Sequence, residues 1–395
     1  MRITLAAVIA IASLSTSACS NREPTPTASS SATSTSSASA AKPSASAPAA
    51  HAPAAEKPKP ALSVVVEPLG PTIVRVGAGA GFSTDHNQLV AWGGALRTRT
   101  DSAPSVGAEA QEVVLLDPAG KLSTKRIGGT AASGLFLPSV AYGDKKLFVF
   151  GGWAPDGREP FDTLHEVDLA TDEIVGRALP KASPWPAARN GGAMIYAKSP
   201  DRLILFAGDG GTADGARFLD DLWTYDIASR KWAAVDKKGP WPSERWHAAM
   251  TIDPTGTRAF MFGGAGPSLD RALWELDLAS MTWRIVETKG IGPETMQGMS
   301  LTYDAAARAL VIIGGLLNIE AGPATSRTVW VLDMDTLTWS STESAALGRR
   351  EHVAAYDPTT RAHYVLGGCT SNEPGNFYRM GPPVVTTMRV RLQRH

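Results

Sequence analysis

The sequence predicts an all-β fold, a six-bladed β-propeller in which each blade is a four-stranded antiparallel sheet. An apolar run that ends in a Gly-Gly or Ala-Gly doublet recurs six times, and the doublets are 58, 56, 56, 51 and 53 residues apart. Repeats of about this length are typical of propellers, in which each repeat folds as one small sheet. Short apolar runs bounded by turn residues also fit buried strands better than helices, which need about ten or more residues. The six runs span residues 89–94, 147–152, 203–208, 259–264, 310–315 and 363–368.

Residues 1–18 have the features of a secretion signal. Arg2 supplies a positive charge, residues 3–14 are apolar, and small residues precede Cys19. An apolar run of this length is too short to span a bilayer. Cleavage directly before a cysteine resembles the bacterial lipobox, although Thr16 stands where that motif favours leucine. The resemblance implies an exported lipoprotein that is modified at Cys19 and anchored to the cell envelope, at the outer membrane or the periplasmic face; secretion with an incidental cysteine is the alternative.

Residues 19–61 separate the signal from the repeats. Of the 42 residues after Cys19, 34 are Ala, Ser, Thr or Pro, and none has a large apolar side chain. Such a segment cannot bury enough surface to offset its ordering entropy, so we expect a disordered tether. As a flexible coil it spans about 35–40 Å. Cys369 is the only other cysteine, so lipid on Cys19 would leave it without a disulfide partner.

A second signature follows the doublets in three repeats. A Trp-x-x-Asp sequence is followed, six residues after the aspartate, by another tryptophan; the aspartates are Asp226, Asp277 and Asp333, and the second tryptophans are Trp232, Trp283 and Trp339. Together with the doublets, this spacing resembles the Kelch repeat. The resemblance implies a Kelch-type propeller over residues 62–395. Two repeats depart from the pattern because Ser123 and Ile174 stand where the second tryptophan belongs, and we expect them to lose the bulky packing it provides.

The two ends of the folded part predict how the propeller closes. The sixth repeat supplies one strand after its doublet, residues 386–392, and then ends without a fourth strand. Residues 62–67 align with the fourth strands of earlier repeats, so we expect this N-terminal strand to pair with 386–392 and complete the C-terminal blade. The pairing removes two open strand edges, which otherwise invite aggregation.

Strand directions place the long connections on one face of the propeller, which we call the loop face. In an antiparallel four-stranded blade, the connection from the second to the third strand and the connection to the next blade share this face, and the short turns lie on the opposite, turn face. Variable loops on a rigid scaffold are the usual place for binding. The long connections include residues 95–111, 153–163, 209–221, 316–327 and 369–383.

Four arginines recur where the chain approaches the innermost strand, close to the loop-face mouth of the central channel. A partial ring of guanidinium groups would bind an anion or a carbohydrate. The alternative is structural arginines that donate to loop carbonyls or to acids of adjacent blades, because arginine at this position belongs to the Kelch repeat. The arginines are Arg75, Arg189, Arg245 and Arg349; the histidines His247 and His352 and the acids Glu244 and Glu351 accompany them.

These observations favour a non-catalytic, monomeric binding protein that holds a protein or carbohydrate partner on its loop face. The 38 basic and 38 acidic residues balance, so nothing predicts a nucleic-acid partner. Too few ligands recur beside His247 for a metal, and we expect no other cofactor. Four of the seven tyrosines hold the framework position of the repeat, two more lie on expected strands, and only Tyr378 lies in a loop, which disfavours a copper oxidase resembling galactose oxidase. The alternative is an enzyme resembling sialic acid mutarotases, in which Glu244 or Glu351 would act on a sugar.

Overall fold

The structure, a computed structural model, describes residues 62–95, 111–130, 135–153, 159–170, 174–212, 214–268, 270–317, 324–370 and 381–395. The predicted signal peptide, Cys19 and the tether lie outside the described residues, as do parts of the long connections. The described part consists of strands and turns, with a 3-10 turn at Ala345–Leu347 and no α-helix. Among these residues, no helix is long and apolar enough to cross a membrane.

Six sheets form the blades, and within each the neighbouring strands of the repeat are antiparallel. Blade one contains β2 (Val76–Ser83), β3 (Gln88–Ala95), β4 (Glu112–Leu116) and β5 (Leu122–Arg126), and blade two contains β7 (Ser139–Gly143), β8 (Lys146–Phe150), β9 (Leu164–Asp168) and β10 (Val175–Ala178). Blade three contains β11 (Ala193–Lys198), β12 (Asp201–Asp209), β13 (Phe218–Asp226) and β14 (Lys231–Val235), and blade four contains β15 (Ala249–Ile252), β16 (Arg258–Phe262), β17 (Leu273–Asp277) and β18 (Thr282–Val286). Blade five contains β20 (Ser300–Asp304), β21 (Ala309–Ile313), β24 (Thr328–Asp333) and β25 (Thr338–Glu343), and blade six contains β26 (Val353–Asp357), β27 (Ala362–Leu366), β28 (Thr386–Arg394) and β1 (Leu62–Pro71). The predicted all-β architecture of four-stranded blades is confirmed.

Short extra strands supplement the blades. The two-residue strand β6 (Gly128–Gly129) continues blade one and pairs in parallel with β10 of blade two, which ties the two blades together at their outer edge. A small sheet of β19 (Met296–Gln297), β22 (Leu316–Leu317) and β23 (Ala324–Thr325) lies within the connections of blade five. The connection predicted at residues 209–221 is shorter than expected, because β12 runs to Asp209 and β13 begins at Phe218.

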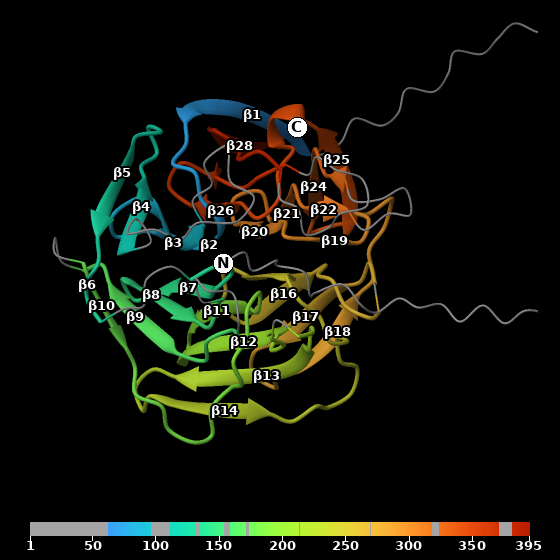
Figure 1. Cartoon of the computed structure of the whole chain (residues 1–395). Coiled ribbons are helices and arrows are strands. Elements are labelled where there is room, and N and C mark those ends of the chain that lie inside the picture. Colours follow the sequence, from blue (N-terminus) through green and yellow to red (C-terminus); the bar gives the residue numbers. More distant parts are fainter. Residues whose placement is uncertain are drawn as a thin grey trace, which may run out of the picture. The chain divides into compact units, whose positions relative to one another are not determined.

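Consecutive blades contact each other through their innermost strands. β2 contacts β7, and the same contact repeats between β7 and β11, β11 and β15, β15 and β20, and β20 and β26; β26 in turn contacts β2. Figure 1 shows β2, β7, β11, β20 and β26 toward the centre of the propeller and the outermost strands, such as β5, β14 and β18, at the periphery. The innermost strands therefore line a central channel.

The N-terminal strand β1 pairs antiparallel with β28 and becomes the outer strand of the last blade (Figure 1). Val64 lies opposite Leu392, and Val66 lies opposite Val390. The observed strand is longer than the predicted residues 62–67, because a register shift near Pro68 lets the pairing continue past the proline. The predicted pairing of the two ends of the propeller is confirmed.

Aromatic side chains pack blade against blade. The second tryptophan of each signature lies against a phenylalanine of the preceding blade, and such pairs contribute about 0.5–1.5 kcal/mol beyond their buried area. The ring centres are 5.5 Å apart for Trp232 and Phe150, 5.2 Å for Trp283 and Phe206, and 6.4 Å for Trp339 and Phe262.

At the interface of blades one and two, the large aromatic side chain comes from blade one and the smaller one from blade two. Ile174 replaces the tryptophan of blade two, and Trp92 of β3 stands where blades two, three and four place a phenylalanine. Both side chains are buried in one core cluster. The expected loss of bulky packing does not occur at this interface, because exchanging the large and the small residue keeps the total volume nearly constant.

Candidate functional site

Six residues, one from each blade, form a closed ring of backbone hydrogen bonds at the loop-face end of the channel. The N–H of each donates to the carbonyl of its counterpart in the preceding blade over 2.8–3.3 Å, and Gly77 of blade one donates to Glu351 of blade six. This cycle, which we call the mouth ring, fixes the six blades relative to one another. Its members are Gly77, Leu137, Gly191, His247, Gly298 and Glu351.

Every residue of the mouth ring has a left-handed backbone, with φ between +55° and +68°. Glycine adopts this conformation freely, which explains its presence at three of the six positions. A residue with a side chain adopts it at a cost of about 1–3 kcal/mol, and such residues are concentrated at functional sites. Leu137 packs toward Gly77, whose missing Cβ leaves it room. His247 and Glu351 are thus the two residues of the mouth ring that carry a polar side chain in this strained backbone conformation.

His247 and Glu351 meet although they come from blades four and six. Nε2 of His247 lies 3.3 Å from a carboxylate oxygen of Glu351. Glycines provide the space: a Cβ on Gly298 would lie 2.8 Å from the Glu351 carboxylate, and a Cβ on Gly191 would lie 2.2 Å from the Trp246 indole. Trp246 stacks on His247 with ring centres 4.2 Å apart. Neighbouring residues therefore fix both members of the pair.

Glu351 is ionised at neutral pH, and His352 beside it is neutral. Burial raises the pKa of the Glu351 carboxyl, but the charges of His247 and Arg350 outweigh burial and hold the pKa below its usual value. An Arg350 guanidinium nitrogen lies 3.6 Å from the second carboxylate oxygen. Burial lowers the pKa of His352 to about 3, and its Nε2 lies 3.0 Å from the Ser300 hydroxyl. The site thus holds an ionised carboxylate whose negative charge is balanced by the adjacent Arg350.

A cavity of about 130 Å³ lies between the mouth ring and the first residues of the innermost strands. Its larger lining side chains are Leu137, His247, Met299, Glu351 and His352, and glycine and alanine make up much of the remainder. This volume accommodates a few water molecules or one amino-acid side chain. Within the described ranges, no three His, Cys, Asp or Glu residues are grouped so that they could hold a metal ion.

Arg189 is buried within the propeller. Its guanidinium group is fully buried and donates two hydrogen bonds to the Asp221 carboxylate, at 2.6 and 2.8 Å. It also donates to the carbonyls of Ala187 and Ala207, at 3.0 and 2.9 Å. Because Ala207 begins the doublet of this blade, the arginine fastens the end of the second strand to the segment that leads into the innermost strand.

The other predicted arginines are buried in the same way. Arg245 donates to the carbonyl of Gly263 at 3.2 Å and Arg349 to that of Gly367 at 3.3 Å, and each glycine begins a doublet. Burial lowers the pKa of Arg349 to about 10. Arg75 is 3 % exposed. Buried, hydrogen-bonded guanidinium groups support the structural alternative, so we leave the arginines out of the candidate site.

Of the residues that the sequence singled out, the structure brings three together. His247 and Glu351 form the pair, and His352 lines the same cavity, whereas Glu244 is not among the lining residues. Sequence reasoning missed the mouth ring. A signal was present, because the second residue after each arginine position is glycine in three repeats and is His247 or Glu351 in two others.

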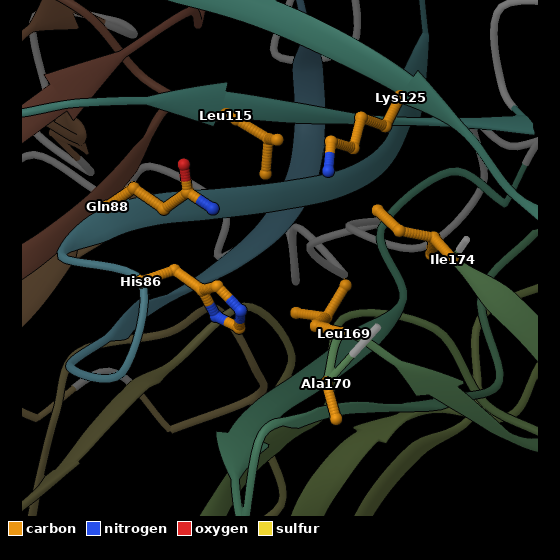
Figure 2. Close-up of a pocket in the computed structure, with 7 residues that line it drawn as sticks. All are labelled: His86, Gln88, Leu115, Lys125, Leu169, Ala170 and Ile174. Atoms are coloured by element: carbon orange, nitrogen blue, oxygen red, sulfur yellow. The ribbon is translucent and has the colours of Figure 1, made fainter. Parts of the chain in front are cut away.

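A second pocket, of about 300 Å³, lies between blades one and two at the turn face. Figure 2 shows the imidazole of His86, the amide of Gln88 and the ammonium group of Lys125 pointing into it. Leu169 and Ile174 of blade two form its apolar wall. The pocket is therefore polar on one side and apolar on the other.

The third strand of blade one explains why this pocket is open. Blades two and four carry a buried glutamate there, Glu166 and Glu275, each paired with basic residues of both neighbouring strands. Leu115 takes this place in blade one, in the same register of the sheet. The shorter, apolar side chain leaves room that the ion pairs fill elsewhere. This pocket lies on the face opposite the predicted one.

Large apolar side chains are exposed on the loop face. Phe161, Ile291 and Val385 are exposed at 37, 84 and 62 % respectively. Phe161 and Val385 lie in connections between second and third strands, and Ile291 lies in the connection from blade four to blade five. The other large apolar side chains that are exposed within the described residues, Val175 and Ile285, lie on outermost strands. The loop face thus exposes three large apolar side chains, each in a different connection.

Comparison with known proteins decides the family. The family model of the KLHDC2/KLHL20/DRC7 Kelch-repeats domain matches residues 69–264 and 137–368. The chain belongs to the Kelch-repeat family. The doublets and the tryptophan signature are therefore Kelch features, and the resemblance read from them is confirmed at the level of the family.

This Kelch propeller is similar to parts of several larger proteins. It is 26 % identical over 261 residues to acyl-CoA-binding domain-containing protein 5 of Arabidopsis thaliana, which covers 61 % of this chain and 37 % of that protein. It is 28 % identical over 195 residues to the Rab9 effector protein with kelch motifs of Bos taurus, covering 46 % and 47 %. With Kelch domain-containing protein 3 of Homo sapiens it shares 26 % over 262 residues, covering 61 % and 65 %. The chain thus matches between 37 % and 65 % of the length of these relatives.

Among solved structures, that of YjhT is similar to this Kelch propeller. The TM-score is 0.60 and the sequence identity 16 %, and the match covers 82 % of this chain and 99 % of that one. At this identity, the likeness shows a common fold.

Proposed function

We propose that this Kelch propeller is an exported protein, lipid-anchored to a bacterial cell envelope, that binds a protein or glycan partner through its loop face without catalysing a reaction. The observation that carries the proposal is the exposure of Phe161, Ile291 and Val385 on that face. Burying such a side chain completely contributes about 1.5–3 kcal/mol, and a few apolar anchors commonly dominate the free energy of an interface. A relative with this repeat is named an effector of Rab9, which favours a protein partner.

The channel mouth would add specificity to this surface. The ionised Glu351 carboxylate accepts hydrogen bonds, and a charge-assisted bond is about twice as strong as a neutral one. The adjoining cavity of about 130 Å³ has room for one side chain. A partner that inserts a hydroxyl or amide group at this point would find a hydrogen-bond acceptor in Glu351, whose charge Arg350 already balances.

The second candidate function is an enzyme that acts on a sugar and resembles sialic acid mutarotases. The pair of His247 and Glu351 favours it, because a histidine and a glutamate side by side at the channel mouth are groups that could exchange protons with a bound sugar. The electrostatics favour binding instead. A general base works best when its pKa lies near the working pH, whereas the pKa of Glu351 is held below its usual value. Faster exchange of sugar anomers with the wild type, absent with Glu351→Gln, would overturn the non-catalytic proposal.

Affinity capture from an envelope fraction tests the binding function. The bait is the full chain with Cys19→Ala, which removes the lipid site. The double variant Phe161→Ser/Ile291→Ser changes the loop face, and Val175→Ser/Ile285→Ser is the matched control on outermost strands. We expect a partner in the wild-type and control captures that is absent from the loop-face capture.

A glycan array with the same three proteins separates the two kinds of partner. Saturable glycan binding that the loop-face variant loses would identify a glycan. Equal capture by all three proteins, or loss in the control variant alone, would contradict binding through the loop face.

A further inference from the structure

The central channel holds a larger cavity at its turn-face end. Its volume is about 670 Å³, and the innermost strands of all six blades line it. None of its lining residues also lines the smaller cavity at the mouth ring. The two ends of the channel are therefore separate candidate sites.

Two layers of side chains surround this turn-face cavity. Residues two apart on a strand point to the same side, so each innermost strand contributes one residue to each layer. The inner layer is apolar, and the outer layer consists of aromatic residues and one isoleucine. The inner layer is Ala80, Val140, Met194, Met250, Leu301 and Ala354, and the outer layer is Phe82, Tyr142, Tyr196, Ile252, Tyr303 and Tyr356.

The tyrosines of the outer layer line the cavity with their aromatic rings. The Tyr142 hydroxyl donates to the Ser83 hydroxyl at 2.8 Å, and the Tyr196 hydroxyl donates to the Asp201 carboxylate at 2.6 Å. These bonds occupy the polar ends of both side chains. Burial raises the pKa of Tyr356 to about 12, and it also raises the pKa of Tyr142 and Tyr196, so the rings stay uncharged.

Two charged residues line the cavity, and one of them is already engaged. The Asp253 carboxylate accepts hydrogen bonds from the backbone N–H groups of Thr257 and Arg258, at 3.0 and 3.1 Å, and from the Arg258 side chain at 3.3 Å. Lys198 is the one basic residue of the lining, and it is exposed at the end of β11. The cavity thus combines an apolar floor with a single cation at its rim.

We infer that the turn-face cavity binds a small anionic amphiphile, a medium-chain fatty acid, with its tail against the apolar layer and its carboxylate beside Lys198. Mostly apolar pockets of roughly 300–1,000 Å³ with a few polar groups are typical of small-molecule sites. Met194 and Met250 suit a flexible tail because the methionine side chain is unbranched and adapts to its contacts. This site is independent of the loop face and of the function proposed for it.

Isothermal titration calorimetry with fatty acids of different length tests the inference, using the full chain with Cys19→Ala. We expect saturable binding of dodecanoate below its micelle concentration. Decanoate should bind about 16-fold more weakly, because each methylene contributes about fourfold in affinity. Lys198→Gln should weaken dodecanoate severalfold and leave dodecanol unchanged, because dodecanol carries no charge.

Filling the cavity provides the second arm of the test. Ala80→Leu and Ala354→Leu, made separately, each add bulk to the inner layer and should weaken dodecanoate binding at least tenfold. Ala234→Leu on the outermost strand β14 is the matched control and should bind as the wild type does. Thermal melting of each variant checks that it is folded. Absence of dodecanoate binding, affinity independent of chain length, or equal affinity in the folded filling variants would each overturn the inference and leave the loop-face proposal untouched.

Discussion

Replacement of Arg189 by glutamine should destabilise the propeller even when no ligand is present. The change removes four hydrogen bonds and leaves the buried carbonyl of Ala207 without this donor. An unsatisfied buried group costs about 1–3 kcal/mol, and breaking a buried ion pair costs about 3–5 kcal/mol. The side chain of Asp221 is 36 % exposed, so water recovers part of this loss. We expect a net loss of about 2–4 kcal/mol, which lowers the melting temperature by roughly 3–6 °C in a domain of this size.

Thermal and urea unfolding of Arg189→Gln measure this loss, with Arg217→Gln as the control. Arg217 is exposed and donates to the Gly210 carbonyl at 3.2 Å, so its replacement should change stability by less than about 0.5 kcal/mol. If Arg189→Gln melts together with the wild type at pH 7, the structural role is wrong and Arg189 returns to the candidate binding site.

The same experiment has a pH dependence. Burial raises the pKa of the Asp221 carboxyl, but the hydrogen bonds and charge of Arg189 bring the pKa below its usual value. A carboxylate with a lowered folded pKa contributes stability that is present above its unfolded pKa of about 3.9 and is lost as the pH falls through the folded value. The stability difference between the wild type and Arg189→Gln should therefore narrow as the pH falls below about 4, and the part due to the lost bonds to the carbonyls of Ala187 and Ala207 should remain. A constant difference down to pH 2 would show that the ion pair contributes little.

Three further predictions concern the anchor, the closing strand and a buried histidine. Cys19→Ala should abolish labelling with palmitate and release the protein from membranes; continued labelling and sedimentation would refute the lipobox interpretation. A chain that begins at Thr72 lacks β1 and should aggregate or unfold, whereas one that begins at Ala61 should remain a folded monomer by size-exclusion chromatography; equal behaviour of the two would contradict closure by β1. His352, with a folded pKa of about 3, stays neutral in the native protein while the unfolded chain takes up a proton below about pH 6.5, so stability should fall from pH 6.5 to 4. His352→Gln should flatten that fall in urea titrations, and an unchanged slope would argue against this group.

The strands could be predicted because the doublets and the tryptophan spacing report local geometry. An apolar run and the glycine doublet that ends it mark where a second strand ends. The last repeat lacked a fourth strand, and residues 62–67 were the segment that matched one. The extension of β1 to Pro71 could not be predicted, because it depends on a register shift that the pairing with β28 imposes. The packing around Ile174 was misjudged for a similar reason. Its compensating residue, Trp92, lies 82 residues earlier in the chain.

The candidate site was less predictable than the fold. Sequence spacing placed His247 and Glu351 at equivalent positions of their repeats, but their contact depends on how far the mouth ring brings blades four and six together. The sequence placed the arginines just before the innermost strands, but it did not identify the groups to which they donate hydrogen bonds. Asp221, the carboxylate that Arg189 pairs with, lies 32 residues further along the chain, in a segment expected to be a loop and observed as part of β13.

Hydrogen exchange on the complex with the captured partner tests the central claim, that the loop face is the binding surface. The proposal predicts slower exchange in the loop-face connections that hold the exposed apolar side chains, residues 159–163, 287–295 and 381–385. The turn-face segments 84–87, 253–257 and 305–308 should exchange at the same rate with and without the partner. Protection confined to the turn-face segments, with unchanged exchange in the loop-face connections, would contradict the account.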